Sequence, residues 1–483
     1  MPDSLILALD LGTSSCRTAL FDSHARRIAG TTAQETYPLI SSASGAAEIE
    51  PNLLLRAVRI CLAETMKSLR GRKVAGLGVS CFWHSLIGTN AKGRPITRVI
   101  TWADARCRAD AAELRKKFNE RQTHARTGCM MRASFWPAKL AWLRRTQRRV
   151  FDRVHQWMSP AEWLQLTLSG EANCALGMAA GTGLFDPTKL AWDPALLAHC
   201  GVRAKQLRPL SDAPTPVAGS LAREFPALAG VPWFPAIGDG AASNLGSGAT
   251  RPGLAAINVG TSAALRVMRS GKTAGAPLGL FCYRVDAERF VVGGAVSDAG
   301  NLRAWCLREL RLPDDDAAIE SALAARPGPV PNLTVLPFWT SDRAPTWNES
   351  AVGVVHGISI STTALDLLQA ITEASYQRIA RIADLVMSVE PRPPKFIVSG
   401  GIQRSPAALQ RLADVLGQPV FPNDEMEASI RGAAIYVLEK LGQPAPAFLL
   451  PKPIKPRARS AKLYATARER QRELEADGAS RKR

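Results

Sequence analysis

The chain has 483 residues, of which 46% are hydrophobic and 21% charged, as in a globular protein with two or three domains. No apolar run approaches the ~20 residues that span a bilayer, and the start lacks the basic region of a signal peptide. The nine cysteines are scattered and form no CxxC pair. We therefore expect a cytoplasmic protein with reduced thiols and no membrane partner. A net charge of +19 could indicate nucleic-acid binding, but no known binding motif accompanies it, so a solvated basic surface that attracts anionic substrates is favoured.

The first half begins with short apolar runs that predict three strands joined by tight turns, at residues 4–10, 16–22 and 26–32. A helix is predicted from Pro51, and a return strand at residues 74–81 follows it. The helix should bury the face formed by Leu54, Ala57, Val58, Cys61, Leu62 and Thr65. Three antiparallel strands, a helix and a return strand form a known nucleotide-binding half-unit.

The second half repeats this plan. The pattern predicts strands at residues 254–259, 263–268 and 289–293, followed by helices at 298–311 and 363–387. A strand at 396–399 and a last helix at 406–416 complete the prediction. The proline-rich residues 209–235 are expected to bridge the halves. We therefore predict an N-terminal domain at 1–242, a C-terminal domain at 243–450 and a basic tail at 451–483, in which residues 460–476 could form a surface helix.

The same short motif follows an apolar run in each half. Gly12-Thr13-Ser14 ends the first predicted strand, and Gly260-Thr261-Ser262 ends the strand at 254–259. Glycine allows a tight turn and close backbone approach, and the hydroxyl and N–H groups of such turns can surround a phosphate. The repeat therefore predicts two similar lobes that grip one polyphosphate, and thus a phosphotransferase.

Phosphoryl transfer also needs a carboxylate near the metal and a base for the attacking hydroxyl. Asp10 ends the first strand, and we assign it to Mg²⁺, with Arg17 facing the phosphates beside Thr13 and Ser14. Asp239 lies between two glycines after an apolar strand, and we assign it as the general base. The alternatives are a turn-capping role for Asp10 and a helix N-cap role for Asp239.

Three further glycines are predicted to contact the nucleotide. Gly400-Gly401, followed by Ser405 and a helix, would let the backbone lie flat against the adenine base. Gly300, near the start of the predicted helix at 298–311, completes the expected nucleotide-binding set.

At this point the chain resembles the FGGY family of carbohydrate kinases over residues 4–442. The run from Asp10 to Arg17 resembles the family's first phosphate motif, Asn258-Val-Gly-Thr-Ser its second, and Ser399-Gly-Gly-Ile-Gln-Arg-Ser its adenosine motif. The resemblance implies an α/β fold with two actin-like (ribonuclease-H-like) domains and a cleft between them. It also implies ATP, Mg²⁺ and an open-chain sugar, sugar acid or polyol as partners, and leaves a homodimer open.

Within this family, several blocks resemble the gluconate kinases. They are His84-Ser85, Trp102-Ala-Asp-Ala-Arg106, Gly128-Cys-Met-Met, Phe281-Cys-Tyr and Arg343-Ala-Pro-Thr-Trp-Asn-Glu. The resemblance implies that Trp83, His84, Asp104, Arg106 and Asp239 bind the substrate. A guanidinium such as that of Arg106 suits a substrate carboxylate. Taken alone, His84 could also be a hydrogen-bonded core histidine, and Arg106 part of a surface ion pair.

We therefore expect phosphorylation of the terminal hydroxyl of a sugar acid, from gluconate to 6-phosphogluconate. One alternative is a kinase for another polyol or ketose, such as xylulose or glycerol. Another is an actin-like nucleotide-binding scaffold without sugar kinase activity, which would need none of Asp239, His84 and Asp104.

Overall fold

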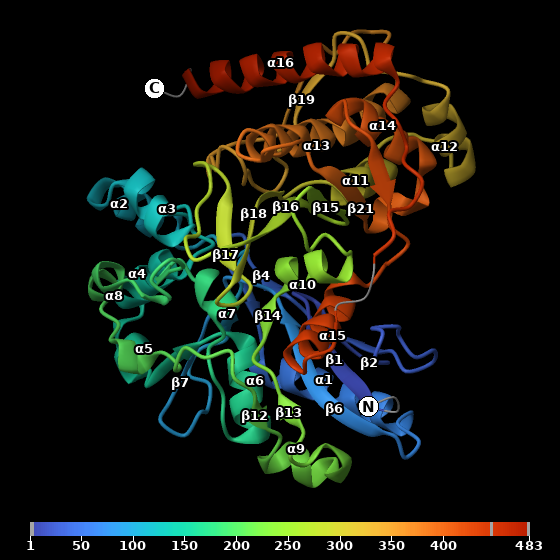
Figure 1. Cartoon of the computed structure of the whole chain (residues 1–483). Helices are drawn as coiled ribbons and strands as arrows, with labels where there is room; N and C mark the ends of the chain where they lie inside the picture. The colour runs from blue at the N-terminus through green and yellow to red at the C-terminus, as the bar shows by residue number, and fades with distance from the viewer. Residues whose placement is uncertain (1–3, 445–447, 481–483) are drawn as a thin grey trace. The chain divides into compact units, whose positions relative to one another are not determined.

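The computed structural model describes residues 4–444 and 448–480 (Figure 1). The outer ends of the predicted domains and tail, at 1–3, 445–447 and 481–483, lie outside the described residues. The chain forms two compact units. The first comprises Met1–Gly248, Arg269–Val291 and Glu427–Phe448, and the second comprises Ala249–Met268, Val292–Met426 and Leu449–Arg483. These units are discontinuous in sequence, unlike the contiguous division expected above.

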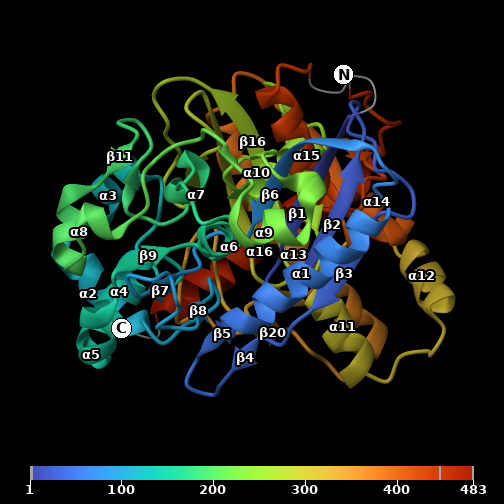
Figure 2. The same ribbon diagram turned by 90° about the horizontal axis from the view of Figure 1, so that it is seen from below.

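The first unit is built on a seven-stranded sheet in the order β12-β13-β6-β1-β2-β3, with β14 also paired to β6. β1 is antiparallel to β2 and parallel to β6. The predicted half-unit is confirmed in the elements β1 (Ser4–Leu11), β2 (Ser15–Phe21), α1 (Pro51–Lys67) and β6 (Lys73–Cys81). α1 packs on β2 and β3 (Figure 2). Every residue of its predicted apolar face is buried.

The third strand of this half-unit lies later than predicted. Within residues 26–32, Arg27 forms only an isolated antiparallel bridge with Phe21, and the strand β3 spans Ala33–Thr36. The side chain of Asp22 accepts hydrogen bonds from the backbone N–H groups of His24 and Arg26, and Gly30 has a φ of +74°. These turns interrupt the pairing with β2 on both sides of the Arg27 bridge, so the third strand begins only at Ala33.

The proline-rich segment at 209–235 extends the first sheet instead of bridging the halves. Its strands β12 (Thr215–Pro216) and β13 (Pro232–Trp233) pair with each other, and β13 pairs with β6. β14 (Ile237–Gly238) then pairs in parallel with the end of β6 and leads into α10 (Asp239–Gly246). Asp239, the predicted general base, therefore lies at the end of a strand in the same sheet as β1.

A mostly helical segment is inserted between β6 and β12, and it has its own apolar core. The first unit also contains β4 (Ile40–Ser41), β5 (Ala47–Ile49), β7 (Ile87–Thr89), β8 (Val99–Ile100), α2 (Arg108–Lys117), α3 (Glu120–Thr127), α4 (Trp136–Thr146), α5 (Arg148–Arg153), β9 (Gln156–Met158), α6 (Pro160–Ser169), α7 (Leu176–Ala180), β10 (Phe185–Asp186), β11 (Ala191–Trp192), α8 (Pro194–Cys200) and α9 (Gly219–Glu224).

The helix α15 (Ala428–Lys440) joins the first unit although it comes late in the chain. It packs on α10, β6 and β1. Glycines permit this close approach, since a Cβ on Gly432 would lie 1.8 Å from the carbonyl oxygen of Ala242, and one on Gly78 would lie 2.6 Å from that of Ala433. Local sequence patterns do not reveal such a long-range contact, which explains the difference from the contiguous division.

The second sheet has the order β17-β18-β16-β15-β21-β22, with β15 and β21 parallel. Its predicted strands are confirmed, and β17 is an addition. The strands are β15 (Leu254–Val259), β16 (Ala263–Ser270), β17 (Phe281–Arg284), β18 (Arg289–Val296), β21 (Lys395–Ser399) and β22 (Val420–Pro422). The predicted helices are found as α11 (Gly300–Glu309), α13 (Ala364–Met387) and α14 (Pro406–Leu416). α12 (Asp316–Ala324), β19 (Thr334–Leu336) and β20 (Val354–His356) also belong to the second unit, whereas β17 belongs to the first.

The predicted tail belongs to the folded body of the second unit. Its helix α16 (Ala458–Ser480) lies against α14 and β19, and the side chains of Tyr464 and Gln471 are fully buried. The charged sequence of this helix suggested a solvated surface element, but its inner face is polar and hydrogen-bonded. In the described parts of the chain, no helix combines the length and apolar character that a membrane crossing requires.

All nine cysteines are buried, as expected of residues that fill the core. Cys16 on β2 and Cys61 on α1 bring their sulfur atoms to 3.6 Å.

Candidate active site

The turn between β1 and β2 carries the first predicted phosphate motif. The backbone N–H of Gly12 donates to the carbonyl of Ser15 at 2.9 Å, and the phenol of Tyr37 donates to the same carbonyl at 3.1 Å. Asp10 and Arg17 are direct partners across the two strands, with Asp10 Oδ2 3.7 Å from Arg17 Nη1. The hairpin register thus places a carboxylate and a guanidinium together at the base of the turn.

Thr13 connects this turn to the predicted sugar-binding block. Its hydroxyl accepts a hydrogen bond of 2.9 Å from the indole Nε1 of Trp102. Ser14 contributes its carbonyl to the backbone N–H of Tyr37 at 3.0 Å. The rim of the phosphate turn therefore depends on a side chain from the segment that contains Asp104 and Arg106.

The charges of two other acidic side chains, those of Asp239 and Glu427, affect the pKa of Asp10. Burial is the largest cause that raises the pKa of Asp10, and the charges of Asp239 and Glu427 act in the same direction, while Ser80 and Arg17 act to lower it; together they leave the pKa at about 6. Glu427 also lies 3.4 Å from Arg17 Nη1. Sequence reasoning missed Glu427, because nothing in its local sequence shows that the start of α15 returns to β1.

This cluster suits a divalent cation that arrives with phosphate. Within the described residues, no group of three or more His, Cys, Asp or Glu side chains gathers to hold a metal by itself. Mg²⁺, however, is usually bound by one or two carboxylates together with phosphate oxygens and water. Asp10 and Asp239 repel each other electrostatically, and a cation between their charges would relieve that repulsion.

Asp239 is the first residue of α10, directly after β14. β1 and β14 both run parallel to β6, so Asp10 and Asp239 stand at the same end of one sheet. Asp239 Oδ1 accepts a hydrogen bond of 2.7 Å from the N–H of Gly240, while Gly238 is the N-cap residue. The carboxylate is only partly buried, which is compatible with its predicted role as general base.

The predicted substrate residue Trp83 supports the turn before Asp239. A Cβ on Gly238 would lie 1.8 Å from the indole ring, and one on Gly181 would lie 2.3 Å from it. Its Nε1 donates to the carbonyl of Gly177 at 2.9 Å. Trp83 is nearly fully buried, so its geometry favours a role in shaping the site.

His84 is held in an uncommon conformation among aromatic rings. Its φ is +65°, in the left-handed region that non-glycine residues rarely adopt. The ring centroid of Phe135 lies 4.7 Å away and that of Tyr283 5.5 Å away. His84 Nδ1 is hydrogen-bonded to the carbonyl of Gly181. Because a carbonyl can only accept, Nδ1 carries the proton, and a neutral ring then has an acceptor at Nε2.

Lys139 on α4 fixes the backbone of His84. Its side chain is fully buried, and its Nζ donates to the carbonyls of His84 and Ser134, both at 2.7 Å. Burial lowers the pKa of Lys139 to about 8. Lys139 was not among the predicted site residues, although a lysine on an otherwise apolar helix face is a signal that could have identified it.

Asp104 and Arg106 form a closed ionic cluster with Glu48. Arg106 Nη2 lies 2.7 Å from Asp104 Oδ2 and also binds Glu48, and its guanidinium stacks on Trp142 at 4.4 Å. Asp104 also accepts the backbone N–H of Ala47 at 3.0 Å. Arg106 is thus already engaged by two carboxylates, which favours the ion-pair alternative over direct binding of a substrate carboxylate.

In the second unit, the second phosphate motif packs against the start of α11. The N–H of Gly300 donates to the carbonyl of Gly260 at 2.9 Å, and the N–H of Asn301 donates to that of Thr261 at 3.2 Å. A Cβ on Gly300 would lie 2.5 Å from the carbonyl oxygen of Gly260, so only glycine permits this approach. Ser262 closes the turn by accepting the N–H of Gly260 at 2.9 Å.

The predicted adenosine motif lies beside the same strand. Gly400 has a φ of +92°, and a Cβ there would lie 2.6 Å from the carbonyl oxygen of Val259. Gly401 begins a short 3₁₀ turn that precedes α14. The hydroxyl of Ser405 caps α14 through the N–H of Ala408 at 3.0 Å and donates to the carboxylate of Glu320. Ser405 is therefore engaged within the protein, and its binding of nucleotide stays a prediction.

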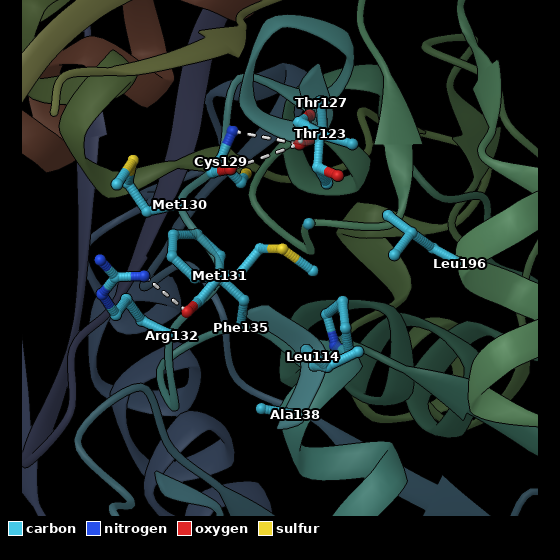
Figure 3. Close-up of a pocket in the computed structure, with 12 residues that line it drawn as sticks. Leu114, Thr123, Thr127, Cys129, Met130, Met131, Arg132, Phe135, Ala138 and Leu196 are labelled. Carbon is cyan, nitrogen blue, oxygen red and sulfur yellow. Dashed lines mark hydrogen bonds between the residues drawn. The ribbon is translucent and has the colours of Figure 1, made fainter. Parts of the chain in front are cut away.

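A small enclosed cavity in the first unit is not this site (Figure 3). Its volume is about 10 Å³, close to the minimum for one water molecule. Figure 3 shows Met131, Phe135 and Leu196 around it, with Thr123 and Thr127 to one side. Its lining is mainly apolar and includes none of the predicted site residues, so we regard it as a packing gap.

Family comparison assigns both halves of the chain. The model for the N-terminal domain of the FGGY family of carbohydrate kinases matches residues 5–246, and the model for its C-terminal domain matches residues 255–438. The chain is 26% identical over 459 residues to the gluconokinase of Bacillus subtilis, covering 91% of this chain and 88% of that protein. It is 25% identical over 423 residues to the xylulose kinase of Escherichia coli, covering 86% and 85%.

Solved structures share the fold over nearly the whole chain. The gluconate kinase of Lactobacillus acidophilus superposes with a TM-score of 0.88 at 24% identity, covering 98% of both chains. The glycerol kinase of Plasmodium falciparum, solved with ADP, has a TM-score of 0.83 at 18% identity and also covers 98% of both chains. The predicted two-domain α/β fold is confirmed by these matches.

Proposed function

Since this chain belongs to the FGGY family of carbohydrate kinases, we propose that it transfers a phosphoryl group from ATP to the terminal hydroxyl of gluconate, forming 6-phosphogluconate. The main observation in support of this chemistry is that Asp10 and Asp239 lie at the same end of one sheet and interact electrostatically. One carboxylate then serves the phosphate and its metal, and the other serves the acceptor alcohol.

Asp239 is the general base in this proposal. Its partly exposed carboxylate accepts the proton of the sugar hydroxyl as the oxygen attacks phosphorus. The N-terminus of α10 stabilises the negative charge of this residue before the proton arrives. Asp10 would hold Mg²⁺ together with phosphate oxygens, and the ion would neutralise charge on the transferring group. Arg17 is placed to assist with that charge.

The nucleotide is assigned to both phosphate turns and to the adenosine motif. Thr13, Ser14, Thr261 and Ser262 offer hydroxyl and backbone N–H groups to the phosphates. Gly12, Gly260 and Gly300 permit the tight backbone that such contacts need. Gly400 and Gly401 would lie against the adenine, with Ser405 fixing the following helix.

Gluconate is favoured as acceptor by the resemblance of the His84 and Trp102–Arg106 blocks and by the gluconokinase among the relatives. His84 offers Nε2 as an acceptor for a substrate hydroxyl. One observation favours a second candidate, a neutral ketose or polyol such as xylulose or glycerol. Arg106 is already paired with Asp104 and Glu48, so the carboxylate of a sugar acid would have to compete with these groups.

A coupled assay of ATP consumption over gluconate, xylulose, glycerol and related sugars tests the substrate assignment. We expect gluconate to give the highest kcat/KM; fast turnover of a neutral ketose without response to gluconate would overturn that choice. Asp239→Asn tests the base. It should lower kcat by roughly 10²–10⁴ while ATP still binds. The control is Asp152→Asn, at an exposed ion pair on α5, which should turn over normally.

A further inference from the structure

A chain of polar contacts within the second unit connects the C-terminal helix to the second phosphate turn. It starts at Glu475 on the inner side of α16. Glu475 Oε2 lies 2.8 Å from Arg378 Nη1 and also binds Arg381, while Oε1 accepts the hydroxyl of Thr346 at 2.9 Å. The Arg378 side chain is only 1% exposed, so this ion pair is shielded from solvent.

Arg378 carries the contact onward to the loop at residues 340–347. Its Nη2 donates to Asp342 Oδ1 at 2.6 Å and to the hydroxyl of Thr346 at 3.2 Å. Asp342 also accepts the backbone N–H of Asn348 at 3.0 Å. Glu475 and Asp342 therefore share one buried guanidinium, and removing either charge leaves that cation undercompensated.

The other end of the loop is bound to the segment that supports the phosphate turn. Thr340 donates from its backbone N–H and its hydroxyl to the carboxylate of Asp298, at 2.9 and 3.0 Å. The N–H of Ala299, the next residue, donates to the carbonyl of Thr261 at 3.2 Å, and that of Gly300 donates to the carbonyl of Gly260 at 2.9 Å. The loop thus binds Arg378 through Asp342, and it is linked to the turn at Gly260 through Thr340 and Asp298.

We propose that Glu475 is a positioning residue for nucleotide binding. Through Arg378 it holds the loop at 340–347, and through the loop and Asp298 it holds the turn at residues 260–262 in the shape that receives phosphate. This inference rests on the proposed function in one respect, the assignment of that turn to ATP. It gives α16 a role in the reaction although the helix lies beyond the residues matched by the family model.

The test compares Glu475→Gln with Glu473→Gln. Both replace a glutamate with glutamine in the same helix, but Glu473 is exposed. ATP affinity is measured by calorimetry without sugar, and KM for ATP and for the sugar is measured in the coupled assay. We expect Glu475→Gln to weaken ATP binding about threefold to thirtyfold with the sugar KM within twofold, and Glu473→Gln to change neither. A lower melting temperature with unchanged ATP affinity would overturn the proposal, because Glu475 would then act only on stability.

Two further variants keep the result decisive. Arg381→Gln removes one partner of Glu475 and is the milder change; if Glu475→Gln does not fold, this variant must still weaken ATP binding at least twofold. Thr261→Ala tests the turn directly. If it weakens ATP binding while the Glu475 and Arg381 variants do not, the positioning role is wrong and the proposed function stands. If Thr261→Ala has no effect on ATP binding, the assignment of the turn fails, and the inference fails with it.

Discussion

Lys139 Nζ donates a hydrogen bond of 2.7 Å to the backbone carbonyl of His84, the residue whose φ is +65°. A left-handed backbone at a bulky residue costs free energy and persists only where its surroundings impose it. The second hydrogen bond of Lys139, to the carbonyl of Ser134, fixes the ammonium in place. A buried lysine thus determines where the imidazole of His84 points.

Lys139→Met should therefore damage sugar binding more than ATP binding. Methionine fills a similar volume but removes the donor from two partly buried carbonyls, which costs ~1 kcal/mol of stability for each lost hydrogen bond. We expect the sugar KM to rise at least tenfold and the ATP KM to stay within twofold, as measured in the coupled assay. Lys117→Met, at an exposed position of α2, serves as the control. Equal losses for both substrates would show that Lys139 supports the fold and not the sugar site.

Local patterns were sufficient to predict the elements that carry the first phosphate motif. The helical spacing of apolar residues after Pro51, the first residue of α1, identified the buried face of this helix, including Leu54 and Cys61, because helical periodicity is a property of neighbouring residues. The register that pairs Asp10 with Arg17 follows from the tight turn at Gly12. The family comparisons confirm the kinase family and the fold, while the roles of the individual site residues stay predictions.

The features that sequence analysis missed depend on contacts between distant segments. Glu427 returns to Arg17 only after α15 has packed against the first sheet, and Glu48 meets Arg106 through the pairing of β5 with β8. The tail looked like a solvated basic element because eleven Lys and Arg residues dominate its composition. Its buried Gln471 and Tyr464 find partners on α13, and no local pattern indicates such partners.

The raised pKa of Asp10 predicts a stability profile for the ligand-free protein. A carboxyl with a pKa of about 6 in the fold and 3.8 ordinarily binds its proton more tightly in the folded state. Stability from this group is therefore fully present below pH 3.8 and is lost as the pH rises through about 6, by up to about 3 kcal/mol. The ionised carboxylate of Asp10 therefore costs stability at neutral pH when no cation compensates it.

Asp10→Asn should remove this dependence. We expect a variant that is inactive but more stable than the native protein at pH 7, with a smaller fall in the urea midpoint between pH 4 and pH 7, followed by circular dichroism. Asp152→Asn, at an exposed position, should keep the native profile. A lower midpoint for Asp10→Asn at pH 7 would contradict the argument, because it would mean that the ionised carboxylate stabilises the fold.

A variant of Arg106 distinguishes two possible roles of this residue: binding the carboxylate of the substrate, and organising the site. Its guanidinium is engaged by Asp104 and Glu48 and stacks on Trp142, so its charge is already matched by two carboxylates. Arg106→Gln would leave the buried Asp104 without its cation, and the segment that places Trp102 against Thr13 should shift. We therefore expect the KM for a sugar acid and the KM for a neutral sugar of similar length to rise together, by about tenfold or more.

The comparison uses gluconate and its uncharged reduced form, assayed with the same enzyme preparation. Arg148→Gln is the control, since Arg148 forms an ion pair with Asp152 on α5 in which both side chains are more than half exposed. That pair should contribute little, because solvent screens it. A loss confined to gluconate would show instead that Arg106 exchanges its partners for the substrate carboxylate. In that case, the pairing of Arg106 with Asp104 and Glu48 would describe only the ligand-free form of a site that binds sugar acids.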